Sequence, residues 1–286
     1  MILKYGRILW LFLMLLLTSG CIEKTPSAAE SKSLQGFIVH DKFIVAGSGS
    51  NIPVTRKLVE GYNAKSKVKI ELPSSIGSDG AINAVKSGRL ELGLISRHLT
   101  SAERELGLKE VPYARVAVIF GVHRDVLDTE ISSSSIIDIV KGSKATWSNG
   151  SKIYVFVRER NDSSNLVLYD KIPGLKDALF ESYHQQRWGV FYRDSDMVDA
   201  LQKTKGSFGV VNTTDLAANH SIKALDFDGV APTQNNILSG EYKLVKELSF
   251  VYKDQISSRS AEFLEFVFSP EGQQILAKWG AVPSGR

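Results

Sequence analysis

The sequence contains only one cysteine, Cys21, among its 286 residues. A chain with a single cysteine cannot form an internal disulfide, so its stability has to come from packing. Apolar residues make up 43% of the sequence, which is enough for sizeable hydrophobic cores and excludes a disordered or collagen-like protein. The length predicts one large domain or two domains of ordinary size.

The sequence also carries little excess charge. Lysine and arginine total 35 against 31 acidic residues, which gives a formal net charge of +4. Proteins that bind nucleic acids usually gather their basic residues into a patch or stripe, and this sequence contains no such run. We therefore expect no nucleic-acid partner.

Sequence signals for catalysis are missing as well. The chain has neither the Gly-x-Ser-x-Gly elbow of hydrolases nor the Gly-x-x-x-x-Gly-Lys-Ser/Thr loop that holds nucleotide phosphates. No two of its 5 histidines lie three or four residues apart, so no helical metal-binding pair is predicted. We expect no enzymatic activity, no metal and no cofactor.

No apolar run is long enough to span a membrane comfortably, because a transmembrane helix needs about 20 residues. The run Ile8 to Leu17 follows Lys4 and Arg7, and the small residues Thr18-Ser19-Gly20 come after it. A charged start, a short apolar centre and small residues before a cleavage point are typical of an export signal. Residues 1–20 are therefore predicted to be a signal peptide.

The segment around Cys21 resembles a bacterial lipobox, in which the cysteine becomes the lipidated first residue of the mature protein. Thr18 occupies the place of the usual leucine, with Leu17 one position earlier. The alternative is an ordinary signal peptide followed by an incidental cysteine. The resemblance predicts an exported protein that is lipid-anchored at the cell membrane or periplasmic face, with the polar residues 21–41 as a flexible tether.

Strand-like and helix-like segments alternate from residue 42 almost to the end. Residues 43–46 and 92–96 are short apolar runs typical of buried strands. Pro53 suits the first turn of a helix, and Thr100-Ser101-Ala102-Glu103 fits a capping box. This alternation predicts an α/β fold with mostly parallel sheets covered on both faces.

Three polar clusters follow predicted strands, in residues 47–53, 75–80 and 158–165. Ligands of open α/β sheets bind beyond the carboxyl ends of strands. Helix N-termini at that edge offer free N–H groups and a positive dipole, which suit an anion. Each cluster alone could also be an ordinary turn or cap. Three clusters at matching positions favour an oxyanion site.

The chain from Lys42 to Pro283, which includes these clusters, resembles the phosphate-binding component of bacterial phosphate ABC importers. That family has a type II periplasmic-binding-protein fold. Gly47-Ser48-Gly49-Ser50 is similar to the first phosphate loop of the family, and residues 77–82 are similar to its glycine-rich turn. Later segments that resemble family signatures are residues 136–147, 228–233, 239–242 and 269–273.

The resemblance implies two lobes with a ligand cleft between them. Lobe I comprises residues 42–117 plus 226–286 and lobe II residues 118–225, with hinge crossings near residues 116–122 and 223–227. It further implies a monomeric protein that captures phosphate for the permease of an ABC transporter. By matching position, the family's anion contacts fall on Ser50, on Asn51 and Ile52 (these two largely through backbone N–H), and on Ser78, Ser96, Arg158, Ser163 and Ser164.

The loop after Arg158 departs from the family pattern, because Asp162 replaces a serine. A buried carboxylate can accept a hydrogen bond from a protonated oxygen of phosphate, but it repels sulfate, which carries no proton. One hypothesis is that Asp162 or Asp79 makes this distinction. The alternative is that Asp162 caps a helix that begins at Ser163. Arg97 is either a second cation at the cleft mouth or a solvated charge at a helix entrance.

The altered loop leaves the cargo open. Sulfate, molybdate or a phosphonate are alternatives to phosphate. A different class of protein, a sensing or adhesion lipoprotein that reuses the fold, is a further alternative that the residues do not exclude.

Overall fold

The computed structural model describes residues 43–285. The chain divides into two units, Met1–Val39 and His40–Arg286, and all described residues belong to the second. The predicted signal peptide in residues 1–20, the lipidation site Cys21 and the tether in residues 21–41 lie outside the described residues.

The first lobe is built around a core of buried side chains that includes Phe43, Leu94, Tyr113 and Phe250. A second, smaller apolar cluster of this lobe contains Ile82, Ile95 and Val251. The elements of this lobe are β1 (Phe43–Gly47), the short 3-10 helix η1 (Gly49–Asn51), α1 (Ile52–Lys65), β2 (Ile70–Glu71), α2 (Gly77–Lys86), β3 (Leu92–Ile95), α3 (Ser101–Glu105), α10 (Ser258–Phe268), α11 (Pro270–Lys278) and β12 (Val282–Pro283).

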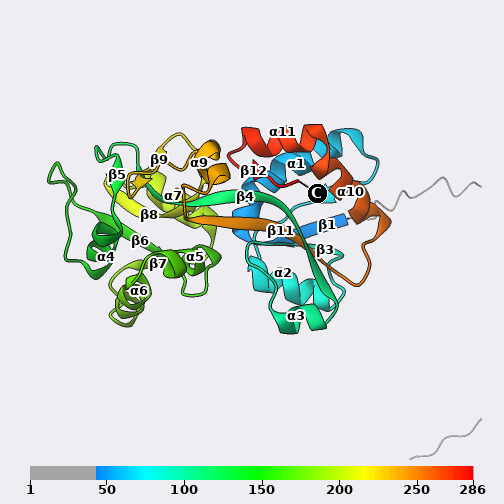
Figure 1. The fold of residues 1–286 in the computed structure, drawn as a ribbon, viewed down its shortest axis with the longest axis horizontal. Helices are drawn as coiled ribbons and strands as arrows, with labels where there is room; N and C mark the ends of the chain where they lie inside the picture. The colour runs from blue at the N-terminus through cyan, green and yellow to red at the C-terminus, as the bar shows by residue number, and fades with distance from the viewer. Residues whose placement is uncertain (1–42, 286) are drawn as a thin grey trace, which may run out of the picture. The chain divides into compact units, whose positions relative to one another are not determined.

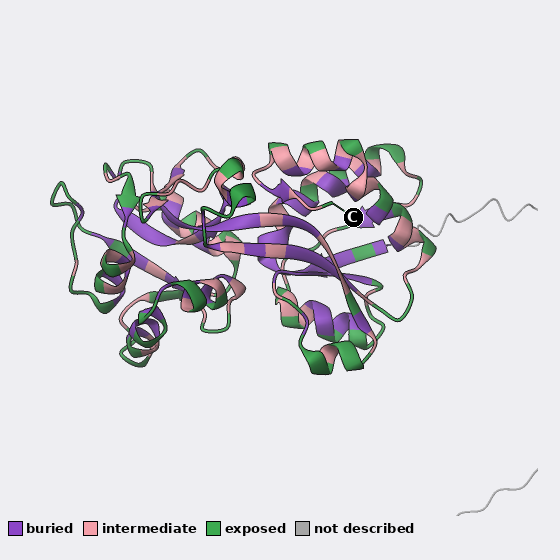
Figure 2. Cartoon of the chain, viewed as in Figure 1, coloured by how far each residue is buried: buried purple, intermediate pink, exposed green. Residues whose placement is uncertain are grey.

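The second lobe has its own core, which includes Phe120, Ile139, Val157 and Phe208. Its elements are β5 (Glu130–Ile131), α4 (Ser133–Lys141), β6 (Tyr154–Arg158), α5 (Ser163–Lys171), α6 (Leu175–His184), β7 (Gly189–Phe191), α7 (Asp194–Lys203), β8 (Ser207–Asn212), α8 (Thr213–Ala217), β9 (Ile222–Ala224), β10 (Asp226–Phe227) and α9 (Gln234–Ser239). Figure 2 shows buried residues along the strands of both lobes and exposed residues on the outer helix faces.

Two long strands, β4 (Leu108–His123) and β11 (Val245–Lys253), lie side by side (Figure 1), and β4 continues from the first lobe into the second. They take part in one sheet of ordered strands β2-β1-β3-β11-β4-β8-β6-β7. Pairs within each lobe, such as β1 with β3 and β6 with β8, are parallel. However, β11 is antiparallel to β3 and β4, and β4 is antiparallel to β8. The predicted mostly parallel sheet is therefore mixed.

The chain first crosses between lobes within β4, where Ala117 pairs with β11 and Val118 pairs with β8. This point falls inside the predicted crossing at residues 116–122. The return differs from the prediction at residues 223–227. There β9 pairs with the end of β4 and β10 pairs with β5, so both strands stay in the second lobe. The chain returns only at Val245, because Tyr242 and Leu244 still pack in the second core.

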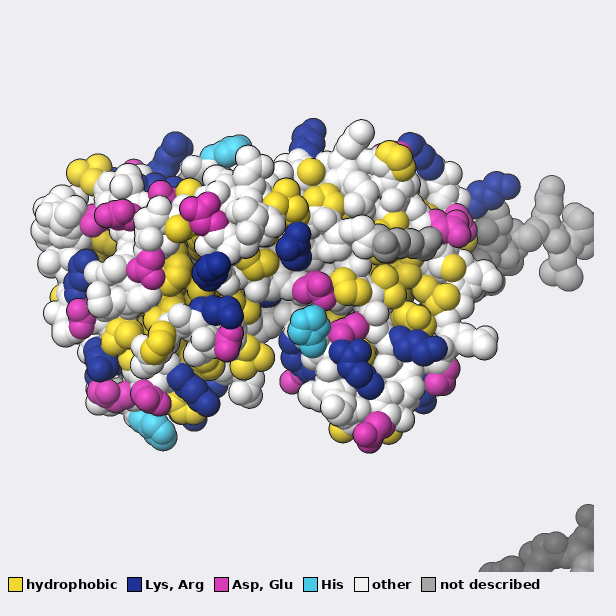
Figure 3. Space-filling model, in the orientation of Figure 1, with side chains coloured by type: hydrophobic (Ala, Val, Ile, Leu, Met, Phe, Trp, Pro, Cys, Tyr) yellow, Lys and Arg dark blue, Asp and Glu magenta, His cyan; other side chains and the backbone are white. Residues whose placement is uncertain are grey.

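Several local predictions are confirmed. Helix α1 begins next to Pro53, α3 has the capping box of Thr100 and Glu103, and Ser269 caps α11. On the face drawn in Figure 3, lysine and arginine side chains are interspersed with acidic ones rather than gathered in a stripe. No helix within residues 43–285 is long and apolar enough to cross a membrane.

Candidate functional site

A cavity of about 620 Å³ lies between the two lobes. Its walls come from loops that follow β1, β3, β6 and β7 and from the start of α2, so the carboxyl ends of parallel strands meet there as predicted. The first lobe contributes Ser48, Gly49, residues 75–80 and Arg97, and the second contributes Arg158, Glu159, residues 161–163, Leu166 and residues 192–194.

Serine hydroxyls form the first-lobe wall of the site. The Ser48 and Ser96 hydroxyls are 2.7 Å apart, and the Ser78 hydroxyl accepts the Ser96 N–H at 3.1 Å. Ser96 follows the buried strand β3, and Ser78 lies in the first turn of α2. The structure therefore brings together two predicted contact residues, Ser78 and Ser96, that are far apart along the chain.

Asn51 and Ile52 do not line this cavity. The Asn51 N–H donates to the Ser48 carbonyl at 3.1 Å, and the Ile52 N–H donates to the Gly49 carbonyl. The Asn51 side chain points into the lobe, where it donates to the Ile95 carbonyl and to the Tyr113 hydroxyl. Both backbone amides that were predicted to hold the anion thus stabilise the η1 turn in this structure.

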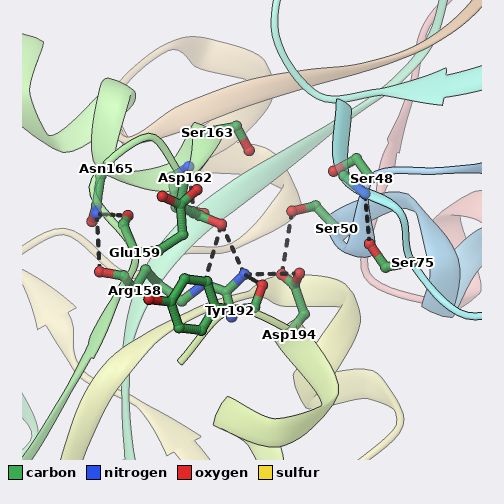
Figure 4. Close-up of polar contacts among 12 residues, drawn as sticks. Ser48, Ser50, Ser75, Arg158, Glu159, Asp162, Ser163, Asn165, Tyr192 and Asp194 are labelled. Atoms are coloured by element: carbon green, nitrogen blue, oxygen red, sulfur yellow. Dashed lines mark hydrogen bonds and ion pairs between the residues drawn. The ribbon is translucent and has the colours of Figure 1, made fainter. Parts of the chain in front are cut away.

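Arg158 is the buried cation of the second-lobe wall, with only 3% of its side chain exposed. It ends strand β6 and donates to Asp162 through Nε at 3.1 Å and Nη2 at 2.8 Å. Nη2 also donates to Asp194 Oδ2 at 3.1 Å (Figure 4). Burial opposes its charge, but Asp194 and Asp162 outweigh burial and raise the pKa of Arg158. The guanidinium is therefore held charged in a fixed orientation beside the cavity.

Asp162 has both carboxylate oxygens occupied. Oδ1 accepts the Ser164 N–H at 2.9 Å and so caps α5, while Oδ2 accepts both hydrogen bonds from Arg158. The structure thus shows the capping arrangement that the sequence left as an alternative. Ser163, the first residue of α5, lines the cavity beside it.

Arg97 and Asp79 meet at the rim of the cavity. Arg97 donates to Asp79 at 2.7 Å and to Glu103 at 2.8 and 2.9 Å. The Arg97 guanidinium lowers the pKa of Glu103 to about 2. Because two carboxylates pair with it, Arg97 is not an unpaired cation at the cleft mouth. The Asp79 side chain is 76% exposed, which does not suit a role that depends on a buried carboxylate.

Two residues of the site escaped the sequence analysis. Lys246 of β11 is buried, and its Nζ donates to the hydroxyls of Ser50, Ser163 and Ser164 at 2.6, 3.2 and 2.8 Å. Asp194 is the first residue of α7 and accepts from Ser50 at 3.4 Å as well as from Arg158. Asp194 follows strand β7 and begins helix α7. The strand-to-helix pattern that located the other polar clusters could therefore also have located Asp194.

The loops of the two lobes touch across the cavity. The Ser96 and Ser163 hydroxyls, one from each lobe, are 2.8 Å apart. At Gly49, a Cβ atom would lie only 1.9 Å from Asp194 Oδ2. Only glycine therefore allows this approach of the first lobe to the N-terminus of α7.

Asp215 is a third carboxylate of the site, after Asp162 and Asp194, and it interacts electrostatically with Asp194 and Lys246. It lies in α8, is buried, and accepts hydrogen bonds from the Asn212 N–H at 2.8 Å and from the Asn212 side chain at 3.2 Å. Burial, together with the negative charge of Asp194, raises the pKa of Asp215 to about 7. Its protonation state therefore changes near neutral pH.

We expect Asp215→Asn to change how stability depends on pH. An unfolded aspartate loses its proton near pH 4, whereas Asp215 in the folded protein keeps it to about pH 7. The folded state binds more protons between these values, so stability falls as pH rises through that window. Asparagine cannot ionise and still accepts hydrogen bonds. Between pH 4 and 8 the variant should therefore gain on the order of 2–4 kcal/mol relative to the parent in urea unfolding.

The matched control for this prediction is Asp170→Asn, because the Asp170 side chain is 71% exposed. Its stability should track that of the parent at every pH. A stability difference between Asp215→Asn and the parent that stays constant from pH 4 to 8 would show that Asp215 titrates normally.

Residues 43–285 contain no group of three or more histidine, cysteine, aspartate or glutamate side chains that could hold a metal ion.

A family model for the PBP superfamily domain matches residues 25–271. The chain belongs to the PBP superfamily.

Individual relatives in the PBP superfamily agree with this assignment. The phosphate-binding protein PstS of Borreliella burgdorferi is 23% identical over 248 residues, which are 82% of this chain and 88% of that protein. A Clostridium perfringens protein, described as a phosphate ABC transporter substrate-binding protein and solved with bound phosphate, superposes with a TM-score of 0.75 at 25% identity. The match covers 85% of this chain and all (100%) of that one.

A more distant structure supports the fold alone. An ABC-type phosphate transport receptor from Vibrio cholerae superposes with a TM-score of 0.60 at 19% identity, covering 84% of this chain and 99% of that one. Together the comparisons confirm the predicted family and its two-lobed α/β fold. The relatives from Borreliella burgdorferi and Clostridium perfringens are described as binding proteins, in agreement with the prediction that the chain is not an enzyme.

Proposed function

We propose that this protein captures inorganic phosphate outside the cytoplasm and delivers it to the permease of an ABC importer. The observation that carries the proposal is Arg158, a buried guanidinium beside a cavity that serine hydroxyls line from both lobes. The relatives from Borreliella burgdorferi and Clostridium perfringens, described as phosphate-binding and phosphate transport proteins, support it.

The donors around the cavity fit a tetrahedral oxyanion. Nη1 of Arg158 is buried without a hydrogen-bond partner, so the guanidinium keeps a donor for a ligand oxygen. Hydroxyls of Ser78 and Ser163 border the same cavity from opposite lobes. Of the other sequence-predicted contacts, Ser96 is hydrogen-bonded to Ser78 and Ser163. Ser50 and Ser164 accept from Lys246, which also donates to Ser163. We retain all five serines, but not Asn51 and Ile52, as proposed parts of the anion site.

We further propose that Asp194 distinguishes phosphate from sulfate. Both Asp162 oxygens are already occupied, and Asp79 is mostly exposed. Within residues 43–285, Asp194 Oδ1 accepts only the long 3.4 Å bond from Ser50, and the residue lines the cavity. It can therefore accept a hydrogen bond from a protonated oxygen of phosphate. Sulfate carries no proton near neutral pH and would meet an uncompensated carboxylate.

Binding between the lobes would favour the closed form. A ligand that contacts Arg158 of the second lobe and Ser78 of the first gains contacts only when both lobes surround it. Such a differential affinity is what hinge closure requires. The closed protein, acting as a monomer, would then be the form that the permease recognises.

For the chain before the described residues, we propose export and anchoring. Residues 1–20 would be removed as a signal peptide, Cys21 would carry the lipid, and residues 21–41 would tether the body to the membrane. The lobe boundaries that we propose are residues 42–117 plus 245–286 for lobe I and 118–244 for lobe II. They follow the return of the chain at Val245.

Calorimetric titration with phosphate, sulfate, molybdate and a phosphonate tests the proposed function. We expect one-to-one binding of phosphate and no measurable heat with sulfate. Tight binding of another oxyanion in place of phosphate would keep the mechanism but change the cargo. Absence of binding by all four anions would contradict the proposal and favour a sensing or adhesion role.

A further inference from the structure

Lys246 joins the two lobes at the site without lining the main cavity. It lies on β11, the strand that pairs with elements of the first lobe and begins where the chain leaves the second. Its Nζ is within 2.6 Å of the Ser50 hydroxyl, which belongs to the first lobe. The same nitrogen is 2.8 Å from Ser164 and 3.2 Å from Ser163, which belong to the second.

The direction of these three hydrogen bonds is fixed by chemistry. A lysine ammonium group has three donors and no acceptor. Each serine oxygen that contacts Nζ must therefore accept, and its single hydroxyl hydrogen has to point elsewhere. The Ser50 hydroxyl donates to Asp194. The Ser163 hydroxyl lies 2.8 Å from the Ser96 hydroxyl of the first lobe.

The charges that surround Lys246 explain how a buried ammonium is tolerated. Burial lowers the pKa of Lys246, and the nearby Arg158 acts in the same direction. Asp162, Asp194 and Asp215 oppose this effect by favouring the charged form. These four groups come from β6, the loop before α5, α7 and α8, all of which belong to the second lobe. Lys246 and Arg158 are thus the two cations among three carboxylates.

We propose that Lys246 is a positioning residue of the anion site, which donates to the Ser163 hydroxyl oxygen and so leaves the Ser163 hydrogen to donate to an oxyanion in the cavity. This inference rests on the proposed function and deepens it. Serine hydroxyls can donate or accept with equal ease when they rotate freely. With its oxygen accepting from Lys246, the Ser163 hydroxyl, which lines the cavity, presents its hydrogen to the ligand and favours an anion over a neutral polar ligand. Lys246 also links this orientation to the approach of the two lobes, because its partners come from both.

Lys246→Met tests the inference, since methionine keeps the unbranched shape but removes the three donors. We expect phosphate affinity, measured by calorimetry with the full chain, to fall by about 30-fold. A loss of this size corresponds to about one charge-assisted hydrogen bond. Lys243→Met is the matched control, because Lys243 is exposed and its Nζ contacts only the Gly240 carbonyl among the contacts described. Its affinity should stay within about twofold of the parent.

A coupling measurement separates positioning from a general structural role. In the parent, Ser163→Ala should weaken phosphate binding because it removes an oriented donor. In the Lys246→Met background the same change should have a much smaller effect, since the hydroxyl is no longer oriented. Additive effects of the two substitutions would overturn the inference, because groups that act independently show additive free energies.

The outcomes also separate this inference from the proposed function. If the parent protein does not bind phosphate, the proposed function fails. If the parent binds but Lys246→Met binds equally well, only the role of Lys246 fails. Should Lys246→Met not fold, as judged by circular dichroism, Lys246→Gln takes its place in the same cycle. Glutamine lacks the charge and offers an acceptor as well as donors, so the same loss of affinity and of coupling is expected.

Discussion

The phosphate affinity of Arg158→Gln is expected to fall by at least about 100-fold relative to the parent. The guanidinium is buried, keeps Nη1 free for a ligand, and is held by Asp162 and Asp194 beside the cavity. Charge-assisted hydrogen bonds contribute about 1.5–3 kcal/mol each, and two of them account for a loss of this size. Calorimetric titration with phosphate measures the change directly.

Arg97→Gln is the matched control, because Arg97 borders the same cavity. Its charge is already compensated by Asp79 and Glu103, and its removal should change phosphate affinity by less than about threefold. Equal losses in the two variants would mean that the cavity attracts anions through its general charge rather than through Arg158. Arg158→Gln also removes the cation that pairs with two partly buried carboxylates, Asp162 and Asp194, so its folded state has to be checked by circular dichroism before titration.

The second large effect concerns selectivity, which Asp194→Asn is expected to relax. The preference for phosphate over sulfate should fall by about 100-fold, because the asparagine side chain no longer repels a fully deprotonated dianion and can donate to it. Most of the change should come from tighter sulfate binding. Competition between phosphate and sulfate, followed by calorimetry at constant ionic strength, gives the ratio of the two affinities.

Asp162→Asn serves as the comparison for Asp194→Asn. Asp162 caps α5 through Oδ1 and holds Arg158 through Oδ2, so its substitution should weaken the binding of both anions and leave their ratio nearly unchanged. The opposite result, in which Asp162→Asn relaxes the preference and Asp194→Asn does not, would assign the discrimination to Asp162. That outcome would restore the hypothesis that the sequence alone suggested.

Much of the site could be predicted because its parts are local. The Gly-Ser segment before Pro53, the turn around Ser78 and the loop after Arg158 each combine a strand end with a helix start within a few residues. Such junctions are readable from apolar runs and capping residues. The position of Asp162 as a cap was also readable, because an aspartate directly before a helix is a common N-cap.

The remainder depends on contacts between distant parts of the chain. Lys246 meets Ser50 across 196 residues of sequence, and a lysine near the start of a strand gives no local sign that it is buried. The return crossing was misplaced for a similar reason. Residues 222–224 and 226–227 form β9 and β10, and tertiary packing decides that these strands pair with β4 and β5 of the second lobe.

The placement of Asn51 and Ile52 shows a limit of transfer by resemblance. Both positions match the family's first loop, yet their N–H groups close the η1 turn on Ser48 and Gly49. A residue type at a matching position predicts a backbone contact only if the local turn leaves that amide free, and the turn itself was not readable from the Gly-Ser string.

The central claim is that phosphate binds between the lobes at Arg158, and calorimetric titration of protein that has been unfolded and refolded to remove bound anions tests it most directly. We predict one phosphate per chain, no competition by excess sulfate, and loss of the binding signal in Arg158→Gln but not in Arg97→Gln. Phosphate binding that persists unchanged in Arg158→Gln, or the absence of any phosphate binding by the parent, would contradict it.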